Sequence, residues 1–135
     1  MAGLSLITVP SIVYGGLVVL GVITQHVHGL PSGIALEPTP LQVSLYRAGH
    51  AHAGVLAVLG LVVQVLLDSA SLPERVKWIA RLGAPTSAIL VSAGFFGIAH
   101  FPALAPVLWA GATSLVVTVS IAGVGLLRKP LDAVL

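Results

Sequence analysis

Residues 104–127 read LAPVLWAGATSLVVTVSIAGVGLL, and this stretch contains no charged side chain. A helix needs about 20 consecutive apolar residues to cross the hydrocarbon core of a bilayer. The stretch is followed at once by Arg128, Lys129 and Pro130. A basic end and then a proline are typical of the point where a helix stops. We therefore predict a membrane-spanning helix over residues 104–127.

Three further charge-free runs have comparable length, and they cover residues 4–24, 48–67 and 84–100. The bilayer offers no water to unpaired peptide groups, so each run is predicted to be helical, and no strand-like alternation competes with this reading. Pro85 suits the first turn of the third helix. The fold class predicted from these runs is all-α, a polytopic membrane protein that forms a four-transmembrane-helix bundle. Residues 1–135 are predicted to form one domain.

The composition supports a membrane protein and excludes several other classes. The chain is 57% hydrophobic and 7% charged, whereas about a quarter of the residues in an ordinary soluble domain are charged. The basic residues are too few and too scattered for nucleic-acid binding. The chain has no cysteine, which excludes disulfides, thiolate ligands and iron–sulfur clusters. Because no Lys or Arg precedes the first apolar run, we interpret that run as a retained helix and not as a cleaved signal.

The charged residues predict how the chain is oriented. Ser71 and Glu74 have the spacing of a capping box, which favours a short amphipathic helix at residues 72–81. That helix carries Arg75, Lys77 and Arg81. The positive-inside rule then places this connection and both termini in the cytoplasm, as in a prokaryotic inner membrane or a plasma membrane. The other two connections lie outside.

All the histidines fall at this predicted outer side, and they are His26, His28, His50, His52 and His100. Ionisable groups near a membrane usually face a protein interior or a cavity, so the cluster is the main functional candidate. Imidazole binds heme iron, zinc, copper and protons. The sequence offers no set of catalytic side chains for a hydrolase. Asp68 is interpreted as a boundary residue at the end of the second apolar run.

The densest polar motif is YRAGHAHAG at residues 46–54. Residues two apart on a helix point about 200° apart, so His50 and His52 cannot both ligate one iron from the same helix. The small residues around them leave a flat surface on which a planar macrocycle could lie. Arg47 could pair with a heme propionate or with a lipid phosphate. We take His52, His50, Arg47 and Tyr46 as the candidate cofactor-binding residues.

A metal ion without heme is the alternative. A zinc or copper site could be formed if four histidines converged: His26, His28, His100 and either His50 or His52. The sequence has no His-x-x-x-His pair at helical spacing, and Glu37 is the single acid on the predicted outer side. Heme needs only one or two imidazole ligands and an apolar slot, so a heme site requires fewer converging histidines than a zinc or copper site.

The chain resembles a family of small membrane isomerases, styrene oxide isomerase and the related hydroxylaminobenzene mutases. The resemblance covers roughly residues 41–96, and it rests on RAGHAHAG at 47–54, on ARLG at 80–83 and on SAGFF at 92–96. It implies a trimer that binds heme b, whose ferric iron acts as a Lewis acid, with His52 as the iron ligand and His50 as the second choice. Phe96 and Val58 stand where the isomerase has a tyrosine and an asparagine, so the resemblance implies the fold and a heme, and not the substrate.

These observations lead to three functional hypotheses. The first is a homo-oligomeric, heme-dependent isomerase acting on a small apolar substrate. The second is a non-enzymatic membrane subunit or small transporter whose histidines handle a metal ion or protons; plain apolar residues at mid-membrane argue against transport. The third is an electron-transfer protein with two axial histidines. The number of axial ligands separates the first from the third, because an isomerase needs an open position on the iron.

Overall fold

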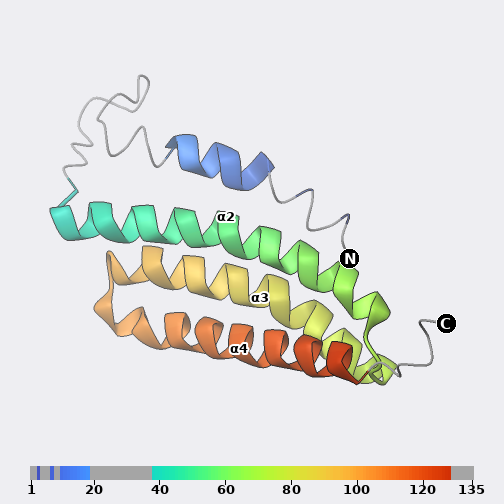
Figure 1. Cartoon of the computed structure of the whole chain (residues 1–135). Helices are drawn as coiled ribbons and strands as arrows, with labels where there is room; N and C mark the ends of the chain where they lie inside the picture. Colours follow the sequence, from blue (N-terminus) through green and yellow to red (C-terminus); the bar gives the residue numbers. More distant parts are fainter. Residues whose placement is uncertain (1–2, 4–6, 8–9, 19–37, 129–135) are drawn as a thin grey trace.

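The computed structural model describes Gly3, Ile7 and residues 10–18 and 38–128. The helices lie in the order α2 (Pro40–Ser69), α3 (Glu74–Ile98), the 3-10 turn η1 (Pro102–Leu104) and α4 (Ala105–Leu127). Residues 10–18, the N-terminal helical segment, are also helical. Figure 1 shows α2, α3 and α4 side by side, with α3 between the other two and the N-terminal helical segment along the far side of α2. No strand occurs in the described part of the chain.

Three of the described helices are long and apolar enough to cross a membrane. The all-helical, membrane-type architecture predicted from composition is therefore confirmed. The first predicted span, residues 4–24, lies largely outside the described residues, and its described part is helical over residues 10–18. A bundle of four spanning helices remains a prediction.

Helix α2 begins at Pro40 and not near residue 48 as predicted. Thr39 and Gln42 form a capping box: the Thr39 hydroxyl accepts from the Gln42 N–H, and the Gln42 side chain accepts from the Thr39 N–H. Proline suits the first position of a helix because its missing N–H has no partner there anyway. A search for apolar runs overlooks this polar start, which extends α2 beyond its apolar stretch.

Helix α3 runs through Pro85 and does not begin there, so the predicted start at residue 84 is wrong. A proline inside a helix removes the N–H that would bond the carbonyl four residues earlier, which here is the carbonyl of Arg81. The side-chain Nε2 of Gln64 donates to that carbonyl at 2.7 Å. The neighbouring helix thus replaces the lost backbone bond, and α3 continues.

The short amphipathic helix predicted at residues 72–81 is not a separate element. Its residues form the first turns of α3, which begins at Glu74 with Pro73 as its N-cap. No side chain caps this start. The predicted capping box fails because Glu74 is the first helical residue, whereas the motif requires the acid at the third. At the other turn, Phe101 is the N-cap of η1, which covers Pro102–Leu104, and α4 follows from Ala105 to Leu127.

A hydrophobic core cluster lies at one end of the described bundle. We call this the basic end; it comprises the end of α2, the start of α3 and the end of α4. A cluster of buried residues centres there on Leu67 and Ala80, each 0% exposed. The Ser71 N–H donates to the Gly125 carbonyl at 2.9 Å, which ties the α2–α3 connection to α4. The opposite end, which we call the histidine end, holds the start of α2, the end of α3 and η1.

Glycine brings α3 and α4 into close contact. A Cβ on Gly94 would lie 2.7 Å from the Cα of Leu108, and a Cβ on Gly111 would lie 2.7 Å from the Val91 nitrogen. In lipid, helices associate through such close backbone approach and through polar contacts, because the surrounding tails are as apolar as the helices. These two glycines therefore fix the α3–α4 pair.

Candidate functional site

His52 is held in one tautomer by its own helix. Its Nδ1 lies 2.7 Å from the main-chain oxygen of Ala48, one turn earlier in α2. A carbonyl oxygen can only accept, so Nδ1 carries the proton and the lone pair of the neutral ring is on Nε2. The ring packs against Phe95 of α3, with centroids 4.8 Å apart, and the residue is exposed on the bundle surface. Among the described residues, Nε2 of His52 has no hydrogen-bond partner, and this nitrogen is suited to binding a metal.

His50 lies on a different side of α2. Its ring packs against Gly16 of the N-terminal helical segment, where an added Cβ would be 2.6 Å from Nε2. His52 contacts α3 instead. The two histidines of the motif diverge, as helical geometry predicts. They cannot both ligate one iron from this chain in this arrangement.

Tyr46 and His100 form a third contact at the histidine end. The Tyr46 hydroxyl lies 2.9 Å from His100 Nε2, and the Tyr46 ring also packs against Phe96, with centroids 5.9 Å apart. One turn earlier, Gln42 Nε2 donates to the Ala99 carbonyl at 3.1 Å. These two bonds tie the first turns of α2 to the end of α3.

Arg47 is exposed and lies on a different face of α2 from His52, since five residues correspond to about 140° around a helix. The charge-free stretch between Arg47 and Asp68 measures roughly 31 Å along the helix, which matches a hydrocarbon core of about 30 Å. His50 and His52 then lie roughly 5 and 8 Å inside the level of Arg47. Both therefore lie in the part of the apolar span nearest the histidine end.

The predicted histidine cluster is distributed over separate contacts in the described part of the chain. His50, His52 and His100 contact the N-terminal helical segment, Phe95 and Tyr46 respectively. His26 and His28 lie outside the described residues. Among residues 38–128 and the described N-terminal positions, no three His, Cys, Asp or Glu side chains come together as a metal-binding group.

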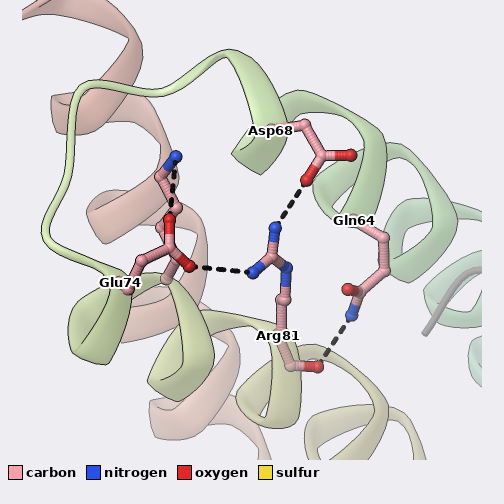
Figure 2. A network of polar contacts seen from close by, with 5 residues as sticks. Gln64, Asp68, Glu74 and Arg81 are labelled. Atoms are coloured by element: carbon pink, nitrogen blue, oxygen red, sulfur yellow. Dashed lines mark hydrogen bonds and ion pairs between the residues drawn. The ribbon is translucent and has the colours of Figure 1, made fainter.

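A polar network at the basic end was missed by sequence reasoning, which assigned Asp68 a boundary role. Figure 2 shows Arg81 of α3 between Asp68 of α2 and Glu74, with distances of 2.5 Å to Asp68 and 3.6 Å to Glu74. Lys77 lies 3.5 Å from Glu74. The Arg81 side chain is 16% exposed, so its charge is held at the helix interface and balanced there by the two acids.

Gln64 completes this network from the interior. The residue is 4% exposed, and its amide nitrogen bonds the Arg81 carbonyl (Figure 2). The sequence held one signal for this contact, because Pro85 stands four residues after Arg81 and leaves that carbonyl without a backbone donor. The arrangement joins α2 and α3 and explains a buried polar residue in an apolar helix without any catalytic role.

Comparison of the chain with protein-family models, with curated proteins and with solved structures finds no match.

Proposed function

We propose that this chain is a membrane hemoprotein in which His52 ligates the iron of heme b through Nε2. The observation that carries the proposal is the bond from His52 Nδ1 to the Ala48 carbonyl. Metal-binding histidines usually donate their other ring N–H to a carbonyl or a carboxylate, which fixes the tautomer and raises the basicity of the ligating nitrogen. His52 has this arrangement before any cofactor is bound.

The surroundings of His52 fit an apolar macrocycle. The residue is exposed on α2, beside the small side chain of Ala51 and one turn from Val55, which is 67% exposed. Phe95 supports the imidazole from the side of α3. An apolar face with one imidazole is what heme requires. Arg47 lies on another face of α2. We therefore do not propose that it pairs with the propionates of a heme bound to His52 of the same chain.

No second histidine lies beside His52 among the described residues, and this favours isomerase chemistry over electron transfer. His50 packs against the N-terminal helical segment and His100 bonds Tyr46, so neither stands beside His52 as a second ligand. A ferric heme held by His52 alone would supply Lewis acidity. By the family resemblance, we propose a homo-oligomeric isomerase of small apolar molecules. The role of this chain is to hold the iron through His52 and to exclude water with Phe95 and the apolar residues of α2.

The proposed orientation puts the basic end in the cytoplasm. Arg75, Lys77, Arg81 and Arg128 all lie at that end of the described bundle. An excess of Lys and Arg marks the cytoplasmic side of membrane proteins. The His52 site then lies near the outer surface.

The test is an absorption spectrum of the detergent-purified protein, oxidised and reduced, after expression with heme supply. We expect a stoichiometric Soret band that is lost or shifted in His52→Ala. His50→Ala and His100→Ala are matched controls that remove an imidazole from the same end of the bundle and should retain the band. A band unchanged in His52→Ala would refute the assignment.

A protein without a Soret band would favour the rival class. If metal analysis were also negative, the chain would be a non-enzymatic membrane subunit or a small transporter. If zinc or copper were present at stoichiometric amounts and lost in His52→Ala, the same nitrogen would serve a metal ion without a macrocycle.

A further inference from the structure

Ser92 is an unusual hydroxyl among those of the described helices. It is 9% exposed, and its Oγ has no hydrogen-bond partner in the described part of the chain. Three other helical hydroxyls bond the carbonyl one turn earlier, and these are Ser44 to Pro40 at 3.0 Å, Ser87 to Gly83 at 2.6 Å and Thr113 to Trp109 at 2.9 Å. A buried unpaired hydroxyl costs free energy, so its presence needs an explanation.

The register of α2 against α3 places Ser92 at the level of His52 along the bundle. Gly49 lies against Phe95 and Phe96, and Gly60 lies against Ala84. Since the two helices run antiparallel, these contacts place Ser92 level with His52 and Ala53. Ser92 is also one turn before Phe96 on α3, so it shares the face that packs on α2.

This part of the α2–α3 interface is narrow and apolar. Ala53 and Gly60 on α2 and Ala84 and Ala88 on α3 contribute side chains no larger than a methyl group, and the larger Leu56, which is buried, lies between the two α2 positions. A Cβ added to Gly60 would still be 3.8 Å from the Ala84 Cβ, an ordinary contact distance. The interface therefore carries one hydroxyl among apolar groups, at the level of His52.

We propose that Ser92 binds the oxygen atom of a small, largely apolar ligand that enters between α2 and α3 from the bilayer. The chemistry of the lining selects this class, because methyl groups hold the apolar body and the hydroxyl pairs with one polar atom. Entry of the ligand separates α2 from α3 at this level and breaks the Gln42–Ala99 and Tyr46–His100 bonds that join the two helices.

A matched pair of serines tests the first consequence. Ser92→Ala removes an unpaired hydroxyl and should leave the free energy of unfolding unchanged or raised. Ser87→Ala removes a hydroxyl that is 0% exposed and bonded to the Gly83 carbonyl, and it should destabilise the protein. Equal destabilisation by both variants would show that Ser92 is an ordinary structural hydroxyl and would overturn the proposal.

Ligand binding tests the second consequence. Benzyl alcohol and toluene share a ring and differ in one oxygen, and both can be titrated into the protein in lipid nanodiscs while methyl signals of Ala53 and Ala88 are followed by NMR. One hydrogen bond corresponds to a roughly three- to tenfold preference for benzyl alcohol in the wild type. Ser92→Ala should abolish the preference, and Ser87→Ala should keep it.

Three results would overturn the assignment. They are equal affinity for the two probes in the wild type, a preference that survives Ser92→Ala, and the absence of saturable shifts at both alanines. None of these measurements uses heme, so the inference and the proposed heme function can fail separately. A protein without a Soret band that still discriminates the two probes would retain the Ser92 site.

Discussion

Replacement of Gln64 by leucine tests why α3 continues through Pro85. Leucine has a similar volume but cannot donate, so the Arg81 carbonyl loses its 2.7 Å bond from Gln64. Interhelical polar contacts in membrane proteins contribute about 0.6 kcal/mol on average and up to about 1.7 kcal/mol. The loss is partly offset because Gln64 Oε1, itself buried without a partner among the described residues, disappears too. We expect Gln64→Leu to lower the free energy of unfolding by about 1 kcal/mol.

The decisive comparison is made in a Pro85→Ala background. Alanine restores the N–H that can bond the Arg81 carbonyl within α3, so Gln64→Leu should then cost almost nothing. The double-mutant cycle should give a coupling of about 1 kcal/mol, measured by reversible unfolding in mixed micelles and followed by circular dichroism. Equal costs of Gln64→Leu in both backgrounds, within about 0.5 kcal/mol, would refute the explanation.

Three further substitutions probe contacts elsewhere in the bundle. Gly94→Ala should lower the free energy of unfolding by about 1–3 kcal/mol, because the added methyl group would lie 2.7 Å from the α4 backbone. Gly123→Ala is the control: no atom lies within 4 Å of its Cβ, so it should be neutral in the same unfolding assay. Tyr46→Phe should lower the free energy of unfolding by no more than about 1 kcal/mol. It should also raise the rate of amide hydrogen exchange in η1. An unchanged exchange rate would mean that the bond to His100 does not hold the turn. Asp68→Asn should cost less than about 1 kcal/mol, because Asp68 is 74% exposed. That cost should shrink in high salt, and a larger or salt-independent cost would show that the ion pair with Arg81 matters more than its exposure indicates.

The helical, membrane-type architecture could be predicted from the sequence for a simple reason. A long apolar run in a bilayer has no alternative to pairing its own peptide groups. The same reasoning gave the divergence of His50 and His52, which depends only on the 3.6-residue period of the helix. Local rules were sufficient for both.

The remaining features depended on contacts between helices. The continuation of α3 through Pro85 could not be inferred, because it depends on a side chain of α2 that bonds the carbonyl of Arg81. Tyr46 and His100 meet only through the pairing of α2 with the end of α3. The level of Ser92 relative to His52 follows from glycines that set the distance between the two helices.

The amino-acid sequence by itself determined that the chain is helical and membrane-bound and that its histidines gather at one end of the apolar runs, because hydrophobicity and helical period act locally along the chain. The tertiary structure decided which contacts those histidines make, how α3 continues through Pro85 and which buried hydroxyl has no partner among the described residues. These properties arise from the register and spacing of packed helices, and register is set by side chains that are distant in sequence.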